Sequence, residues 1–111
     1  MTDISKEDLL SSISLYSEAI TLVKGISFFV FSLDEYYDHE TGSYNDEEYV
    51  LKCANSLLDE SDKVYYECNK LIDKIKFVDM KVTRDFCNAR NSLKDMSMLL
   101  KQHFKPGTFL K

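Results

Sequence analysis

Apolar side chains recur between residues 50 and 78 in steps of four and three, and this periodicity constrains the fold more than any other feature. Because an α-helix turns once in 3.6 residues, such spacing places all members of the line on one helical face. The members are Val50, Ala54, Leu57, Ser61, Val64, Cys68, Leu71, Ile75 and Val78. We therefore expect a long amphipathic helix that buries this face against neighbouring helices.

The same spacing on either side predicts two more helices. The first has a line formed by Leu9, Ile13, Tyr16, Ile20, Val23, Val30, Leu33 and Tyr37, widened by Leu15, Leu22, Ile26, Phe29 and Tyr36. The third has Val82, Phe86, Ala89, Leu93, Met96, Leu100 and His103. We predict an all-α fold: one domain, 1–111, built as an antiparallel bundle of three long helices near 6–38, 46–77 and 82–104. No strand is expected, and a break at Gly25 would give four helices.

The connection between the second and third helices has two possible forms. No Gly or Pro lies between Gly42 and Pro106, so residues 46–104 could form one helix roughly 88 Å long. The periodicity slips after residue 78, and Asp79 and Thr83 can cap a new helix. We therefore expect a turn near 77–83. The first connection, 39–45, is rich in turn-forming residues, and Asn45 or Ser43 is expected to cap the second helix.

Acidic residues are concentrated in the middle of the chain. Residues 25–51 hold seven Asp or Glu and no Lys or Arg, whereas residues 52–111 hold twelve basic and eight acidic residues. The net charge of −5 disfavours attraction to nucleic acid or to an anionic membrane. Seven like charges repel one another, and four tyrosines accompany them within residues 34–49. Tyrosine is favoured at protein interfaces, so this segment is either a partner-binding surface or a solvated tip.

Metal and catalytic sites find little support in the sequence. The acidic segment does not fit the calcium-binding EF-hand loop, because neither possible frame aligns both Gly42 and the acidic positions. Glu35 and His39 are four residues apart and would share a helical face, but a metal site needs further ligands. No phosphate-binding glycine loop and no nucleophile motif is present. We therefore predict no enzyme activity, no cofactor and no metal.

The three cysteines are predicted to be reduced thiols that pack in the core. Cys53, Cys68 and Cys87 are odd in number, and no pair has the short spacing of a zinc site. This fits a cytoplasmic protein. The most apolar run, 25–33, is too short for a membrane span, so none is expected. The basic C-terminal stretch contains Phe104 and Phe109, but scattered cations also suit the end of a helix.

These observations favour a small cytoplasmic protein-binding module, present as a monomer or a homodimer. Its partner would be another protein with a basic surface, which includes nucleic-acid enzymes blocked by a phage-type inhibitor and toxins blocked by an immunity protein or antitoxin. The alternative is a helical assembly subunit or secretion chaperone that pairs through its apolar stripes. The predicted partner-binding residues are Asp34, Glu35, Tyr37, Asp38, Glu40, Tyr44, Asp46, Glu47 and Glu48.

Overall fold

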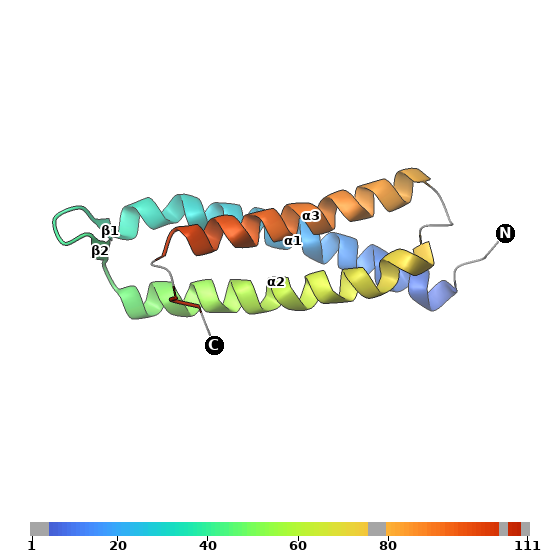
Figure 1. Ribbon diagram of the computed structural model, residues 1–111, viewed down its shortest axis with the longest axis horizontal. Coiled ribbons are helices and arrows are strands. Elements are labelled where there is room, and N and C mark those ends of the chain that lie inside the picture. The colour runs from blue at the N-terminus through green and yellow to red at the C-terminus, as the bar shows by residue number, and fades with distance from the viewer. Residues whose placement is uncertain (1–4, 76–79, 105–106, 110–111) are drawn as a thin grey trace.

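Three long helices make up most of the molecule, and the all-α prediction is confirmed. The computed structural model describes residues 5–75, 80–104 and 107–109. Helix α1 spans Lys6–Tyr36, α2 spans Glu47–Ile75 and α3 spans Met80–Gln102. All three pairs of helices are in contact along a body 62 Å long. In Figure 1, α1 and α3 run toward the same end of the molecule and α2 runs away from it.

Helix α1 is continuous, so the four-helix alternative is wrong. It begins after Ser5, whose hydroxyl accepts a hydrogen bond from the Asp8 amide at 3.1 Å, as expected for a helix cap. It then passes through Gly25 without a break. One glycine costs only about 1 kcal/mol in a helix, and the packing of the whole helix outweighs that cost.

The glycine itself offers a test of this interpretation. A Cβ atom added at Gly25 would meet no other atom within 4 Å, and the residue is exposed. Gly25→Ala is therefore expected to raise the free energy of unfolding by about 1 kcal/mol, because alanine restricts the unfolded chain and has a higher helix propensity. Urea denaturation measures the change. A destabilised variant would contradict an open helical site at this position.

The core face of α2 lies where the periodicity placed it between Val50 and Ile75, whereas Val78, the last member of the predicted line, lies outside the described residues. Its buried residues are Val50, Ala54, Leu58, Ser61, Val64, Cys68, Leu71 and Ile75. Leu58 replaces the predicted Leu57, which is half-buried. In α3, Phe86, Ala89, Leu93 and Leu100 are buried as expected, whereas Val82 and His103 at the ends of the predicted line are exposed.

The predicted core line of α1 is wrong at its N-terminal end. Leu9, Ile13 and Tyr16 are 41, 55 and 39% exposed. The buried residues instead repeat every seven positions: Ser12, Ala19, Ile26 and Leu33. Small side chains at the first two of these positions face the other helices, so the larger residues beside them point outward.

One serine in each helix is buried without leaving a polar group unsatisfied. The Ser12, Ser61 and Ser97 hydroxyls donate to the carbonyl oxygens of Leu9, Leu57 and Leu93 at 2.7–2.9 Å. Each bond stays within one helical turn of its own helix. Serine can therefore occupy an apolar face at little cost in hydrogen bonding.

Helices α2 and α3 are separate and pack against each other, so a continuous helix over 46–104 is wrong. Residues 77–79 of the expected turn, including the proposed cap Asp79, lie outside the described residues. Thr83 does not cap the start of α3. It lies within that helix, and its hydroxyl donates to the Ile75 carbonyl at 3.1 Å, which satisfies the end of α2 instead.

Helix α1 also passes a simple test for membrane spans. It is the one helix in the described part of the chain that is long and apolar enough to cross a membrane, and only 11% of its apolar window is buried. This longer apolar stretch also contains serine, threonine and glycine, so the length of the uninterrupted run 25–33 does not reveal it. Core helices of soluble proteins and signal sequences meet the same criterion, so the finding assigns no location.

Candidate functional site

A short hairpin connects α1 to α2, although no strand was expected. Strand β1, Tyr37–Asp38, pairs antiparallel with β2, Ser43–Tyr44, so that Tyr37 lies opposite Tyr44. Within the turn, the Asp38 side chain accepts a hydrogen bond from the Glu40 amide at 2.9 Å, and the Gly42 amide donates to the Asp38 carbonyl at 2.8 Å. Gly42 has φ +71°, a left-handed conformation that glycine adopts without strain.

The start of α2 follows from the hairpin rather than from the predicted caps. Ser43 lies in β2, and the Asn45 amide donates to the Tyr36 carbonyl. Asp46, with φ 52°, immediately precedes the helix, and its carbonyl accepts from the Val50 amide at 3.1 Å. The expected acidic first turn is present as Glu47 and Glu48, which suits the positive end of the helix dipole.

A row of aromatic rings packs the hairpin against the end of α3. The Tyr44 ring lies 5.4 Å from the Tyr37 ring and 5.4 Å from the Phe104 ring, and Phe104 lies 5.2 Å from Phe109. The Tyr44 hydroxyl donates to the His103 carbonyl at 3.0 Å. Burial raises the pKa of Tyr44, and the neighbouring Tyr37 and Asp34 raise it further. Phe104 and Phe109 therefore contribute to packing at this end of the bundle.

The seven carboxylates of the predicted site come together at this end of the molecule. The segments that carry them, which are the end of α1, the hairpin and the start of α2, lie together at one end of the molecule (Figure 1). All are exposed except Asp38, which is half-buried. The ion pairs Lys70–Glu67 and Lys74–Asp8 lie elsewhere in the molecule and involve none of the seven. We call this end, residues 34–49, the acidic tip.

The tyrosines of the tip divide into two kinds. Tyr37 and Tyr49 are 36 and 52% exposed, whereas Tyr44 and Tyr36 are half-buried and pack against the core. The first pair therefore offers the larger exposed area to a partner. For Tyr44 the sequence could not show this, because its ring packs on Phe104, which is distant along the chain.

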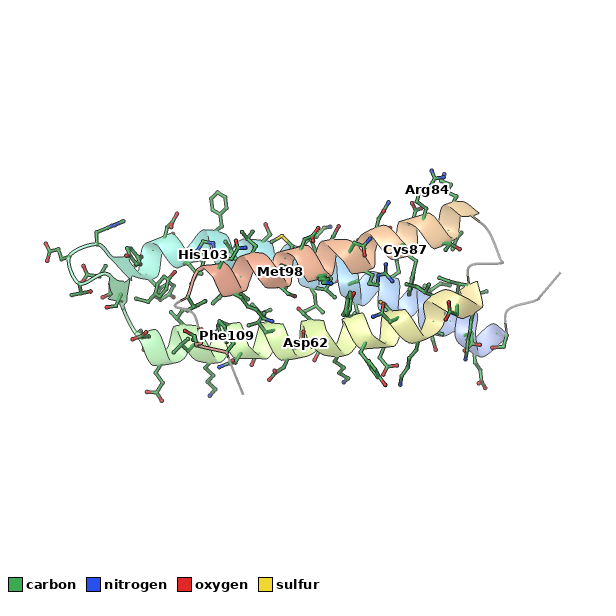
Figure 2. All side chains as sticks on the ribbon, in the orientation of Figure 1. Asp62, Arg84, Cys87, Met98, His103 and Phe109 are labelled. Atoms are coloured by element: carbon green, nitrogen blue, oxygen red, sulfur yellow. The ribbon has the colours of Figure 1, made fainter. Side chains whose placement is uncertain are left out.

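The end of α3 adds residues that sequence reasoning did not place at the tip. Figure 2 shows His103 and Phe109 toward the hairpin end of the molecule and Arg84 at the opposite end. A hollow of about 320 Å³ lies between the hairpin, the first turns of α2 and the end of α3. Glu47 and His103 both line it. Two exposed basic side chains, Lys101 and His103, therefore lie at this end of α3.

The proposed pairing of Glu35 and His39 on one helical face is wrong. Helix α1 ends at Tyr36, and His39 lies in the hairpin turn, where its ring packs on Tyr37 at 4.9 Å. No group of three or more potential metal ligands occurs among residues 5–75, 80–104 and 107–109.

The cysteines are unpaired and packed to different degrees. Cys68 is 1% exposed in the core, whereas Cys53 and Cys87 are half-buried. Burial raises the pKa of the Cys68 thiol to about 11. A hydrogen bond with Cys53 raises the pKa of Tyr49. A neutral, buried Cys68 suits a core residue rather than a nucleophile.

The raised pKa predicts how stability depends on pH. The Cys68 thiol loses its proton near pH 9 in the unfolded chain but only near pH 11 in the folded one. Its contribution to stability is therefore complete below pH 9 and lost between pH 9 and 11. Over that window wild type should lose about 2 kcal/mol more than Cys68→Ala, as measured by urea denaturation. Equal losses would show that the thiol ionises as readily in the folded protein.

No family model, no curated protein and no solved structure matches the chain.

Proposed function

We propose that the chain is an antiparallel three-helix bundle that binds a basic surface of another protein through its acidic tip, and so acts as an inhibitor or antagonist. The observation that supports this most is the gathering of seven carboxylates at one end, without an ion pair to any described cation. Such a cluster repels itself, and a cationic partner would relieve the repulsion. The class includes inhibitors of nucleic-acid enzymes, immunity proteins and antitoxins.

The carboxylates and the tyrosines would contribute differently to binding. Long-range attraction between exposed charges mainly speeds association and weakens as salt screens it. Tyr37 and Tyr49 would supply short-range contact area, because a tyrosine ring is apolar with a polar end. The cytoplasm is the proposed location, since three unpaired thiols suit a reducing compartment.

The test neutralises the tip without altering its backbone. The variant Asp38→Asn, Glu40→Gln, Asp46→Asn, Glu47→Gln keeps the side-chain oxygen that accepts from the Glu40 amide, and asparagine tolerates the φ of 52° at position 46. A matched control neutralises four exposed acids on α2 and α3: Glu60, Asp62, Asp85 and Asp95. Both variants change the net charge by the same amount.

Wild type, tip variant and control are used to capture proteins from a lysate of the source organism, and captured proteins are identified by mass spectrometry. We expect a basic partner with wild type and control but not with the tip variant.

Surface plasmon resonance should then show an association rate at least tenfold lower for the tip variant at low salt, with a smaller difference near physiological salt. Equal rates for all three proteins would place the interface elsewhere.

The exposed tyrosine Tyr37 gives a separate prediction. Tyr37→Ala should raise the dissociation rate of the captured partner roughly tenfold, the effect of about 1–2 kcal/mol of lost contact, while the association rate changes little. If the partner is a nucleic-acid enzyme, its nucleic acid should compete with this protein for the same groove. An unchanged dissociation rate would show that the Tyr37 ring packs within the hairpin and does not contact the partner.

A helical assembly subunit or secretion chaperone is the second candidate. It is favoured by the apolar residues that α1 leaves on its surface, of which Phe28 and Phe31 are 77 and 85% exposed. In that case capture would depend on these phenylalanines and would survive neutralisation of the tip.

A further inference from the structure

The outward face of α1 near its C-terminal end holds two large apolar side chains that no part of the described chain covers. Phe28 and Phe31 are 77 and 85% exposed, and they line a shallow hollow of about 670 Å³. Every residue lining that hollow belongs to α1. The buried residues Ile26 and Leu33 lie on the opposite side of the helix, so this face points away from α2 and α3.

The side chains on this face follow a symmetric order. Around the peptide bond between Phe29 and Val30, Phe28 is balanced by Phe31, Ser27 by Ser32, and Lys24 by Glu35. All six line the hollow. When two copies of a helix pack antiparallel, residues at equal distances from the crossing point face each other. A second copy of this face would therefore set phenylalanine against phenylalanine and serine against serine.

The same arrangement pairs opposite charges. Lys24 of each copy would face Glu35 of the other, which gives two equivalent ion pairs at the ends of the contact. Both side chains are exposed, and neither forms an ion pair with a described residue of its own chain. A twofold interface uses the same patch on both molecules, so the patch must complement itself, and this one does.

We propose that this face of α1 binds the same face of a second copy, antiparallel, with the crossing point at Phe29–Val30. Gly25, at the flank of the face, has open space around it in the single chain and would let the second helix approach closely. The four phenylalanines would bury on the order of 700 Å², below the ~1,200 Å² of a stable interface. The dimer should therefore be weak and its population should rise with protein concentration.

The proposal is independent of partner binding at the acidic tip, although Glu35 belongs to both surfaces. The hairpin and the start of α2 lie beyond the face that pairs, so a dimer would present two tips. The tip variant described above leaves Lys24, Phe28, Phe31 and Glu35 unchanged and should dimerise like wild type. Failure of one proposal is therefore distinguishable from failure of the other.

Sedimentation equilibrium between about 10 µM and 1 mM tests the pairing with charge variants. Lys24→Glu and Glu35→Lys should each weaken the dimer at least tenfold, because each places like charges together twice. An equimolar mixture of the two variants should form a heterodimer at least as tight as wild type, since both of its pairs are attractive. The double variant Lys24→Glu, Glu35→Lys should recover wild-type affinity.

Other results would overturn the proposal. Wild type that is monomeric at 1 mM would remove the interface. If charge reversal leaves the dimer affinity unchanged but the double variant Phe28→Ser, Phe31→Ser is monomeric, the copies associate through these phenylalanines in a different geometry. Binding to phosphatidylcholine vesicles that needs both phenylalanines, with no dimer in solution, would assign the face to a lipid surface. Helical circular dichroism identical to wild type confirms that each variant is folded.

Discussion

Replacing Ile26 with alanine should lower the free energy of unfolding by about 3 kcal/mol. Ile26 is fully buried on the core face of α1, where it packs with the other two helices. Truncation removes apolar contacts and leaves a cavity that rigid helices fill only in part, so the cost exceeds the transfer energy of the lost methyl groups. Thermal and urea denaturation measure the loss, and the midpoint should fall by about 10 °C or more.

The matched control is the same substitution on the same helix. Ile13 is 55% exposed, so Ile13→Ala should change the free energy of unfolding by no more than about 0.5 kcal/mol. Together the two variants decide which line of α1 faces the core. Similar losses at the two positions would mean that the helix is rotated relative to the packing described here.

That comparison also shows where sequence periodicity succeeds. In α2, charged residues fill the outward face, so only the apolar line from Val50 to Ile75 can face the other helices. The order of helices and their bounds, within a few residues, follow from such lines. The turn between α2 and α3 is harder to predict, because the Thr83 hydroxyl can bond to the end of α2 or to the start of α3. Its hydrogen bond to the Ile75 carbonyl shows that it serves the end of α2.

In α1 the same method fails at one end for a physical reason. Large apolar residues lie on both sides of the helix there, while serine and alanine, Ser12 and Ala19, occupy the buried line. A pattern based on hydrophobicity chooses the larger residues, whereas packing against two neighbours selects the smaller ones.

The acidic tip was predictable in composition but not in structure. Seven carboxylates within residues 34–48 must lie in the same part of the molecule, whatever the local structure between them. The hairpin within it has strands of two residues each, and the ring of Tyr44 contacts Phe104, sixty positions away along the chain. No local pattern contains that contact, so the separation of packed Tyr44 from exposed Tyr37 had to come from the structure.

Tyr44 gives the second large expected effect. Tyr44→Ala should destabilise the protein by about 2–3 kcal/mol, because it removes ring contacts with Tyr37 and Phe104 together with the bond to the His103 carbonyl. Tyr44→Phe, which loses only the hydroxyl, should cost about 1 kcal/mol. Tyr66→Ala is the control, since Tyr66 is 61% exposed on α2 and should cost about 0.5 kcal/mol or less.

Hydrogen exchange shows which parts of the molecule lose stability in the Tyr44 variant. In Tyr44→Ala the amides of Gly42 and Asn45, which are hydrogen-bonded in the hairpin, should exchange much faster, together with those at the end of α3. Amides in the middle of α2 should follow only the global loss of stability. Because Asp38 and Glu40 lie in this hairpin, the variant should also weaken partner binding through disorder of that part of the tip. Unchanged protection at Gly42 and Asn45 would show that the hairpin forms without its contact to α3, and that Tyr44 is available to a partner after all.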